Sequence, residues 1–555
     1  MVTKQWWKEA IVYQIYPRSF NDSNGDGIGD LNGIGERLDY LQNLGVDVIW
    51  LGPVYESPNE DNGYDISDYE NIMKEFGTMA DFERLLQEVH ARSMKLIMDL
   101  VLNHTSDEHP WFVESRSSLD NPKRDWYIWS DGKNGAEPNN WESIFGGSAW
   151  EFDEQTKQYY MHLFAKKQPD LNWENKEMRS ELYNIVNRWI DRGIDGFRID
   201  AISHIKKKAG FPDMPNPAQA PYVECYDYMM NHEGIDAFLR EFSDTALKGH
   251  DIMTVGEANG VTVDDVDRWV NEENGYFNMI FQFEHLELWN KQESADIDAQ
   301  ALIRILTKWQ NNLENVGWNA LFIENHDLTR SVSTLGNDTD YWKASAKMLG
   351  AMYFFMKGTP FIYQGQEIGM TNAGYPDIED YNDVGTLKYY QIEREKGVPH
   401  DQIMAIIKRT CRDNSRSPMQ WDSSPFSGFT SGSQSWIDMN PNYRHINVAE
   451  QERDRHSILS FYKKMIQLRK QHEVLVYGKY RLMEATDEGL IIYTRTLNHI
   501  EARIICNFNE QETWVMDLPD EKNLVLHNYE DMQRGSLRPY EARMYILKQE
   551  GDKTA

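Results

Sequence analysis

The stretch ENKEMRSELYNIVNRWIDRGIDGFRID, residues 174–200, decides the fold, because it predicts an amphipathic helix that is followed directly by a buried strand. One apolar stripe at helical spacing marks the helix over 174–192 and consists of Leu182, Ile185, Val186, Trp189 and Ile190. Gly193 ends this helix, and the short run GFRID predicts a strand at 196–200. A helix that leads into a buried strand indicates an α/β unit, in which helices cover a parallel sheet.

The same alternation of short apolar runs and amphipathic helical patterns extends through the first four-fifths of the chain. The predicted strands are residues 10–16, 46–51, 95–101, 196–200, 252–257, 277–283, 319–327 and 359–367. Eight strand-then-helix units predict an α/β fold of the (β/α)8 TIM barrel type. In that fold the chemistry takes place at the C-terminal ends of the strands, so polar residues at those ends are candidates for a site.

Two long segments interrupt the alternation. Residues 105–171, which are polar and aromatic with several turn signals, predict an inserted subdomain B after the third strand. A second insertion, about residues 368–430, follows the eighth strand. The barrel is therefore expected to comprise residues 1–104 and 172–479. Short strands without helices over 480–555 predict a C-terminal antiparallel β-sandwich.

The composition of the 555-residue chain restricts its partners. A formal net charge of −32 argues against nucleic acid and anionic membranes, and the longest apolar run, LGAMYFFM, is too short to span a bilayer. No secretory signal is visible at the N-terminus, and three widely spaced cysteines, Cys225, Cys411 and Cys506, fit a reducing compartment. We therefore expect a cytoplasmic protein with a small neutral ligand and leave its oligomeric state open. The 18 tryptophans suit a sugar, although ordinary packing also uses them.

Three of the predicted strands end in carboxylates, Asp200 in GFRID, Glu257 in TVGE and Asp327 in ENHD. A barrel brings these ends together around one mouth. Glycoside hydrolysis needs such a set, with one carboxylate to attack or stabilise C1 and one carboxylic acid to protonate the departing oxygen. Any one of them alone is more readily a salt-bridged structural residue, but three at strand ends favour a catalytic site.

Three further polar residues stand beside these carboxylates. Arg198 lies two residues before Asp200 and hence on the same strand face, so it is expected to hold the nucleophile ionised. His104 in LNHTS and His326 in ENHD are expected to donate hydrogen bonds to sugar hydroxyls.

The loop NDSNGDGIGD, residues 21–30, predicts a structural Ca²⁺ site. Its oxygen ligands fall at the spacing of a calcium-binding loop and are Asp22, Asn24, Asp26, the carbonyl of Ile28 and Asp30. The helix-loop-helix motif itself is excluded, because Gly33 replaces its bidentate Glu and a strand precedes the loop. The alternative is a solvated turn, since Asn, Asp and Gly dominate turns.

The stretches DLVLNHTS, GFRID, TVGE and ENHD resemble, in order and spacing, the four short sequence regions of the α-amylase family of retaining α-glycosidases, glycoside hydrolase family 13. QPDLNW resembles the fifth region of that family. WWKEAIVYQIYPRSF, DNGYDISDY and RDNSRSPMQW narrow the resemblance to its oligo-1,6-glucosidase and α-glucosidase branch. The similarity covers nearly the whole chain.

The resemblance implies a role for each of the three carboxylates. Asp200 would be the nucleophile that forms a covalent β-glucosyl intermediate, and Glu257 the general acid and then the general base. Asp327 would stabilise the distorted, oxocarbenium-like ring. The same resemblance implies that the Ca²⁺ loop is structural and lies away from the catalytic centre.

The resemblance also implies a closed sugar pocket. Asp61 and Arg412 would clamp the far hydroxyls of the terminal glucose and make the enzyme exo-acting, while Tyr64 would stack under that glucose. Three residues in or beside the inserted subdomain are expected to shape the acceptor side, namely Phe145, Phe164 and Gln168.

The preferred linkage is expected to be α-(1→4) rather than α-(1→6). Relatives that cleave α-(1→6) bonds resemble one another in having Val after the nucleophile, where this chain has Ala201, and many read GEMP where this chain reads GEAN with Asn259. The alternative for Ala201 is a small packing residue. The sequence thus predicts an exo-α-glucosidase that acts on maltose, maltotriose and similar sugars, with transglucosylation as a further activity.

The sequence leaves three alternatives to this function. The chain could be an oligo-1,6-glucosidase, or a transglycosylase of the sucrose isomerase or trehalose synthase type, which returns glucose to a sugar rather than to water. Amino-acid transporter heavy chains keep this barrel as a binding ectodomain, but they carry a membrane anchor and lack the full catalytic set, so this alternative is discarded.

Overall fold

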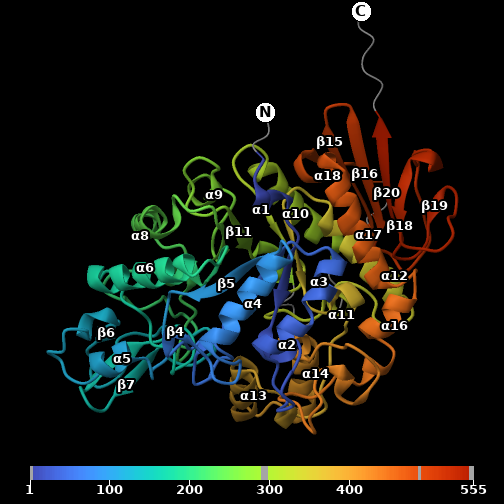
Figure 1. Cartoon of the computed structure of the whole chain (residues 1–555). Coiled ribbons are helices and arrows are strands. Elements are labelled where there is room, and N and C mark those ends of the chain that lie inside the picture. Colours follow the sequence, from blue (N-terminus) through green and yellow to red (C-terminus); the bar gives the residue numbers. More distant parts are fainter. Residues whose placement is uncertain (1–3, 289–297, 486–488, 549–555) are drawn as a thin grey trace, which may run out of the picture.

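Eight parallel strands form a nearly closed barrel at the centre of the structure, a computed structural model that describes residues 4–288, 298–485 and 489–548 (Figure 1). The strands are β1 (Val12–Ile15), β2 (Val48–Leu51), β5 (Lys95–Val101), β9 (Gly196–Asp200), β10 (Met253–Ala258), β11 (Met279–Gln282), β12 (Ala320–Leu321) and β13 (Thr359–Tyr363). Their order is β11-β10-β9-β5-β2-β1-β13-β12, and a parallel bridge between Ile280 and Asn319 joins the two ends. The prediction of a (β/α)8 barrel is confirmed.

The strands read as continuous apolar runs because both of their faces are buried. Along β1 and β2, Val12, Val48 and Trp50 belong to one buried cluster, which fills the barrel interior. Tyr13 and Ile49, which alternate with them, belong to a second cluster that packs against the surrounding helices. The period-two alternation of a strand therefore divides its side chains between two cores.

Helices cover the outside of the barrel. The helix predicted over 174–192 is α6 (Lys176–Asp191), and its N-cap side chain, Asn175, accepts a hydrogen bond from the Met178 N–H. Gly193, with φ +99°, follows the helix as predicted. The other long helices of the barrel are α3 (Leu38–Leu44), α4 (Met79–Ala91), α8 (Ile235–Phe242), α10 (Ala299–Leu313), α12 (Trp342–Phe354) and α17 (Ile458–Gln471).

The seventh strand is much shorter than predicted. Residues 319–327 were expected to be extended throughout, but β12 comprises only Ala320–Leu321. Glu324 is buried and bonds to Arg330 at 2.8 Å and to the Ser331 N–H at 2.9 Å, so the polar end of the run leaves the sheet. Asp327 consequently lies on a loop beyond the strand.

Two segments project from the lower part of the barrel in Figure 1. Residues 105–171 contain α5 (Pro110–Ser115) and a three-stranded antiparallel sheet of order β6-β8-β7, with β6 at Trp129–Ser130, β7 at Trp150–Asp153 and β8 at Gln158–Met161. Trp141, Trp150 and Met161 pack there against Met229, which follows β9 in the chain. After β13, the second segment contains α13 (Val384–Glu395) and α14 (His400–Thr410). The division of the chain into domains at the predicted boundaries stays a prediction.

The C-terminal part of the chain forms antiparallel sheets, as predicted. Five strands have the order β14-β15-β16-β20-β18, with bounds Lys479–Leu482, Leu490–Leu497, Ile500–Asn507, Ala542–Lys548 and Leu524–His527. A second pair, β17 (Thr513–Trp514) and β19 (Ser536–Leu537), packs on this sheet through an apolar cluster that includes Leu490, Ile505 and Leu537. Residues 549–555 of the predicted sandwich lie outside the described residues.

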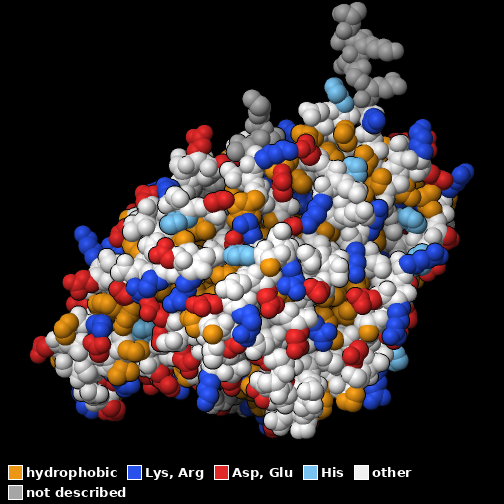
Figure 2. Space-filling model, viewed as in Figure 1, with side chains coloured by type: hydrophobic (Ala, Val, Ile, Leu, Met, Phe, Trp, Pro, Cys, Tyr) orange, Lys and Arg blue, Asp and Glu red, His pale blue; other side chains and the backbone are white. Residues whose placement is uncertain are grey.

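On the face shown in Figure 2, acidic and basic side chains are interspersed, and no large patch of a single charge sign is seen. Across the described ranges, no helix combines the length and the apolar character needed to cross a bilayer. The cysteines Cys225, Cys411 and Cys506 are buried and free.

We predict that Gly196→Ala destabilises the barrel more than a glycine substitution in open space. Gly196 has φ +146°, and a Cβ at this position would lie 1.9 Å from the Met253 carbonyl oxygen of the neighbouring β10. The substitution should cost about 3 kcal/mol or more of folding free energy, because neither strand can move without breaking the ladder. Gly249→Ala is the matched control, since Gly249 has φ +93° but no atom within 4 Å of a Cβ. Equal losses of melting temperature in the two variants would contradict this account.

Candidate active site

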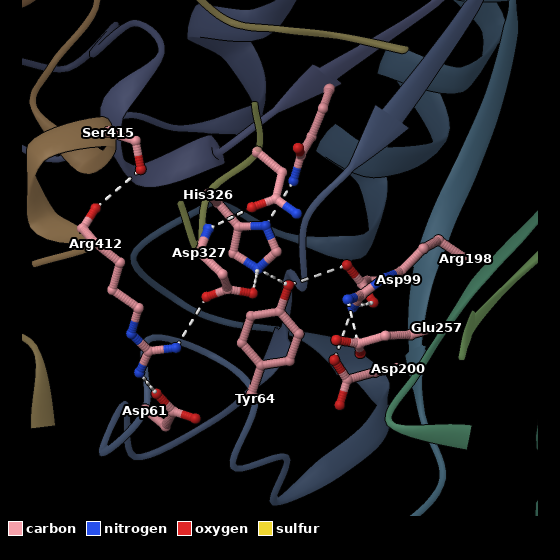
Figure 3. A network of polar contacts seen from close by, with 12 residues as sticks. Asp61, Tyr64, Asp99, Arg198, Asp200, Glu257, His326, Asp327, Arg412 and Ser415 are labelled. Carbon is pink, nitrogen blue, oxygen red and sulfur yellow. Dashed lines mark hydrogen bonds and ion pairs between the residues drawn. The ribbon is translucent and has the colours of Figure 1, made fainter. Parts of the chain in front are cut away.

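The three predicted catalytic carboxylates meet at one end of the barrel. Asp200 is the last residue of β9, Glu257 belongs to β10, and Asp327 lies on the loop after β12 (Figure 3). Arg198 joins the first two, because its Nη1 lies 2.7 Å from Asp200 Oδ1 and its Nη2 lies 2.8 Å from Glu257 Oε2. The barrel thus brings together residues that are more than fifty positions apart in the chain.

A fourth carboxylate, Asp99 of β5, completes this group and was missed by the sequence reasoning. Its Oδ1 lies 2.8 Å from Arg198 Nη1, and its Oδ2 accepts hydrogen bonds from Trp50 Nε1 and from the Tyr64 hydroxyl, each at 3.1 Å. The side chain is fully buried. A signal was present, since Asp99 is the one acidic residue in the apolar run KLIMDLV.

Burial raises the pKa of Asp200 well above its ordinary value, and the facing carboxylate of Glu257 adds to this increase. Arg198 lowers this pKa, but burial and the like charge outweigh it, so the expectation that Arg198 alone holds Asp200 ionised is not met by the net direction. The pair therefore retains a proton more readily than two solvated carboxyl groups do. One anionic and one protonated carboxyl is the arrangement that glycoside hydrolysis uses.

His326 and Tyr64 form the wall between Arg198 and Asp327. Their rings stack with centroids 5.4 Å apart and an angle of 9° between the planes, and the Tyr64 hydroxyl lies 2.5 Å from His326 Nε2. His326 Nε2 also lies 3.0 Å from Asp327 Oδ2. The ring is oriented from behind by Gln14 of β1, whose amide nitrogen lies 2.7 Å from His326 Nδ1 and which the sequence reasoning did not identify.

Asp327 is surrounded by cations. Its Oδ1 lies 2.8 Å from Arg412 Nη1 and 2.9 Å from Arg416 Nη2. Burial raises the pKa of Asp327, but His326, Arg412 and Arg416 together outweigh burial and hold the pKa well below its ordinary value. Asp327 is therefore an anion at every pH at which the protein is expected to work. Arg416 belongs to the stretch RDNSRSPMQW but was not singled out from the sequence.

Arg412 also connects the barrel to the segment after β13. Its Nη2 lies 2.8 Å from Asp61 Oδ1, and its Nε is ion-paired with Asp383, which caps α13 by accepting a hydrogen bond from the Thr386 N–H. The guanidinium stands 5.3 Å from the Phe145 ring. A cavity of about 770 Å³ lies beside this group. Asp383 was missed because no periodic pattern surrounds it in the chain.

His104 and the residues predicted for the acceptor side adjoin Asp61. Gln168 Nε2 lies 3.2 Å from Asp61 Oδ2 and 3.1 Å from His104 Nε2. The Phe164 ring is 5.0 Å from the His104 ring and 5.9 Å from the Phe145 ring. Burial lowers the pKa of His104 to about 4. The structure therefore brings Phe145, Phe164 and Gln168 to one side of the site.

The two residues that were associated with linkage lie just beyond the strand ends. Ala201 has φ +45°, and its N–H donates a 2.8 Å hydrogen bond to Glu257 Oε2. Asn259 Nδ2 lies 3.4 Å from His204 Nε2, and both residues line a second cavity of about 550 Å³. Ala201 thus contacts the group formed by Asp200 and Glu257, whereas Asn259 lies two residues beyond Glu257 and contacts His204.

The loop predicted to bind Ca²⁺ bonds mainly to its own backbone. Asp22 accepts hydrogen bonds from the Gly27 N–H at 2.7 Å and from the Thr430 hydroxyl at 2.5 Å. Asp30 accepts from the Ser23 hydroxyl at 2.8 Å and caps α2 (Leu31–Glu36). These donors offset part of the negative charge without a metal.

The donor set of the loop suits a hard cation in its chemistry, since it contains carboxylate, amide and carbonyl oxygens. Within the described part of the chain, however, no three His, Cys, Asp or Glu side chains are grouped so as to hold a metal. To bind Ca²⁺, the oxygen atoms of the predicted ligands would have to move closer to one common point. These ligands are Asp22, Asn24, Asp26, Ile28 and Asp30. Ca²⁺ binding stays a prediction.

A (β/α)8 barrel with this group of carboxylates at its strand ends defines a glycoside hydrolase. The family model described as "Alpha amylase, catalytic domain" matches residues 14–478, and the chain belongs to this α-amylase family. The resemblance stated from the sequence is confirmed.

The comparison with curated proteins finds oligo-1,6-glucosidases. The chain is 55% identical over 551 residues to the probable oligo-1,6-glucosidase 3 of Bacillus subtilis, with 98% of this chain and 99% of the relative covered. It is 52% identical over 563 residues to the oligo-1,6-glucosidase of Halalkalibacterium halodurans, with 99% and 100% covered.

Solved structures with the same fold include enzymes with other names. The trehalose-6-phosphate hydrolase of Bacillus licheniformis superposes with a TM-score of 0.91 at 44% identity and covers 98% of this chain and 100% of its own. The isomaltulose synthase of Protaminobacter rubrum superposes with a TM-score of 0.93 at 39% identity, with 99% and 100% covered.

For the Asp22–Asp30 loop we propose a structural Ca²⁺ and predict that chelation lowers the melting temperature, because a ligand of the native state stabilises it by mass action. Asp26→Ala should lower the melting temperature in Ca²⁺ and remove the effect of the chelator. Asp131→Ala is the control, since Asp131 is an exposed residue of the inserted segment that bonds to Gln158. Two results together would contradict this proposal, namely no metal in elemental analysis and an Asp26→Ala variant that melts at the same temperature as the wild type. The loop would then be interpreted as a solvated turn.

Proposed function

We propose that the protein is a retaining exo-acting α-glucosidase that releases glucose from the non-reducing ends of short α-glucosides, with α-(1→6)-linked sugars preferred. The observation that carries the proposal is the bridge from Arg198 to Asp200 and Glu257, opposite an anionic Asp327. The relatives named oligo-1,6-glucosidase support the α-(1→6) linkage. The α-(1→4) preference expected from the sequence has no such support and becomes the second candidate.

The two chemical steps follow from the positions of Asp200 and Glu257. A carboxylate oxygen of Asp200 attacks C1 of the glucose, the bond from C1 to the glycosidic oxygen breaks, and the proton of Glu257 passes to that oxygen. Glu257, now an anion, then takes a proton from water, whose oxygen attacks C1 and releases Asp200. Asp327 stabilises the positive charge that develops on the ring in both steps.

The spacing of the two carboxyl groups supports retention of configuration. Inverting enzymes keep their carboxyl groups roughly 6.5–9.5 Å apart so that a water fits between them and the sugar, whereas retaining enzymes hold them about 5–5.5 Å apart. Asp200 and Glu257 both contact the same Arg198 guanidinium, at 2.7 Å and 2.8 Å. A side-chain hydrogen bond also joins Asp200 and Glu257 directly, which brings the two carboxyl groups closer together than the inverting arrangement requires.

The ion pair between Asp61 and Arg412 supports exo action. It connects the loop before β4 (Asp68–Ile72) to the segment after β13 at 2.8 Å. A chain end can enter a site that is closed in this way, but an internal glucose cannot pass through it.

Neutral sugars suit the 770 Å³ cavity beside Arg412 better than phosphorylated ones. The acidic residues that line it are Glu142, Glu224, Asp327, Asp383 and Glu393. Its two lining cations are Lys396, paired with Glu393 at 2.8 Å, and Arg412, paired with three carboxylates. A phosphate group would therefore compete for cations that are already neutralised. We accordingly propose that trehalose 6-phosphate, the substrate that the name of one structural relative indicates, is not a substrate here.

The second candidate, α-(1→4) preference, rests on Ala201. Its small side chain next to Glu257 leaves room on the acceptor side, where a larger residue would discriminate between linkages. A 1,6-linked sugar hangs from an additional carbon and approaches at another angle. Packing differences of this size are worth about 1–3 kcal/mol in specificity.

We predict that Asp200→Asn lowers turnover of isomaltose by about 10³-fold or more, because only the attacking charge is lost from a nearly isosteric side chain. Asp213→Asn is the control, since this exposed carboxylate pairs with Lys133 on the surface of the inserted segment. Turnover within tenfold of the wild type, after deamidation has been excluded by mass spectrometry, would remove Asp200 from the proposed role.

We predict that kcat/KM for isomaltose exceeds that for maltose by about tenfold, with trehalose 6-phosphate hydrolysed slowest. Chromatography of the products from these sugars and from sucrose also measures how much glucose is transferred to a sugar instead of water. A preference for maltose would favour the second candidate, and Ala201→Val should then raise the ratio of isomaltose to maltose. The melting temperature of this variant has to be checked, because a β-branched residue at φ +45° is strained.

A further inference from the structure

Lys207 is a buried lysine beside the site that the proposed mechanism does not use. It is 7% exposed, and its Nζ lies 2.7 Å from Asp170 Oδ2 and 2.8 Å from Asn103 Oδ1. Asp170 and Asn103 are fully buried. Because an ammonium group has only donors, it donates to the carbonyl oxygen of Asn103, and the amide nitrogen of Asn103 cannot take that position.

The orientation of Asn103 determines what faces His104. With its oxygen directed to Lys207, the amide nitrogen of Asn103 lies 3.3 Å from His104 Nδ1. The amide of Gln168 is oriented in the same manner, since its Oε1 accepts a 2.9 Å hydrogen bond from the Ala165 N–H and its Nε2 lies 3.1 Å from His104 Nε2. An N–H donor therefore stands opposite each ring nitrogen.

A neutral imidazole can accept a hydrogen bond at one nitrogen, whereas an imidazolium carries N–H on both and can accept none. A protonated His104 would thus face donors on both sides. We propose that Lys207 is a positioning residue that keeps His104 neutral, acting through the amide of Asn103. This proposal rests on the function proposed above only in the role that it gives to His104.

The charges around His104 agree with a neutral ring. Burial is the largest cause that lowers the pKa of His104 to about 4, the charge of Lys207 acts in the same direction, and Asp170 and the Tyr64 carbonyl oppose them. His204, which stands on the other side of the Phe164 ring, contributes no charge at neutral pH, because burial lowers its pKa to about 3.

A neutral His104 has a consequence for catalysis. The resemblance to the family places His104 against the hydroxyls of the glucose on which positive charge develops. A cation at this position would repel that charge, and the repulsion is large in a buried site of low dielectric constant. Lys207 would therefore preserve activity at mildly acidic pH.

The test is an NMR pH titration of the full chain labelled with ¹⁵N-histidine, in which the ring nitrogens report their protonation directly. The signals of His104 are assigned from their loss in His104→Gln. Lys207→Met removes the charge and allows the Asn103 amide to rotate, whereas Lys206→Met is the matched control, because Lys206 pairs with Glu174 outside this network. We expect His104 to stay neutral down to pH 5 in the wild type and in Lys206→Met, and to become protonated between about pH 5 and 7 in Lys207→Met.

The same variants separate a positioning role from a merely structural one by their pH profiles. Between pH 7 and pH 5, kcat/KM for isomaltose should decrease in both proteins, and the decrease should be about tenfold larger in Lys207→Met than in the wild type. This is the effect expected if His104 of the variant becomes protonated in that range. Asn103→Asp places an acceptor opposite Nδ1, so His104 should become protonated between about pH 5 and 7 in this variant as well. It replaces Lys207→Met in the test if Lys207→Met does not fold.

Either of two results would overturn the proposal. One is a wild-type His104 that titrates near its ordinary value, and the other is a folded Lys207→Met or Asn103→Asp in which the ring stays neutral. Because NMR reads protonation without turnover, a protein that shows the expected titrations but does not hydrolyse α-glucosides would contradict only the proposed function.

Discussion

The site depends on one buried guanidinium, that of Arg198, which contacts carboxylates from three adjacent strands. Asp99 of β5, Asp200 of β9 and Glu257 of β10 lie 2.7–2.8 Å from its nitrogens. Burial lowers the pKa of Arg198, but the three carboxylates outweigh burial and raise it well above its ordinary value. Three acids that share one base cannot all ionise at low cost, which is why the pKa of Asp200 stays raised beside a cation. The geometry that ties the strands together thus also lets the pair of carboxyl groups formed by Asp200 and Glu257 retain a proton.

A second guanidinium repeats this arrangement on the other side of the sugar site. Arg412 pairs with Asp61, Asp327 and Asp383, which come from the loop before β4, the loop after β12 and the cap of α13. Here Arg416 adds a further charge, so Asp327 is held fully ionised rather than sharing a proton. The two arginines thus stand beside carboxylates in different states, since the pKa of Asp200 is raised beside Arg198 and that of Asp327 is lowered beside Arg412. Both states are needed at once by a reaction that passes through an oxocarbenium-like ring.

The sequence predicted the features that local patterns encode, namely the strands and the carboxylates at their ends. It missed the residues whose role comes from contacts that form only in the assembled barrel. Strands of continuous apolar residues and the carboxylates that end them, such as Asp200, could be read directly. Asp383 could not, because its role comes from an ion pair with Arg412 and from no pattern in the surrounding chain. The length of β12 was wrong because Glu324 bonds to Arg330, six residues away and outside the sheet. Lys207 is one of three consecutive lysines, and only burial distinguishes it from its neighbours.

Linkage specificity is the property that the sequence was least able to decide, and the structure gives a physical reason. Ala201 does not only border the acceptor side, because its N–H holds Glu257 Oε2 while its backbone has φ +45°. The residue after the nucleophile therefore affects two things at once, namely the space for the acceptor sugar and the position of the acid that protonates the leaving oxygen. A larger side chain at 201 changes the strain of this turn as well as the volume beside it. Side-chain identity at this position consequently cannot be translated into a linkage preference without the backbone that carries it.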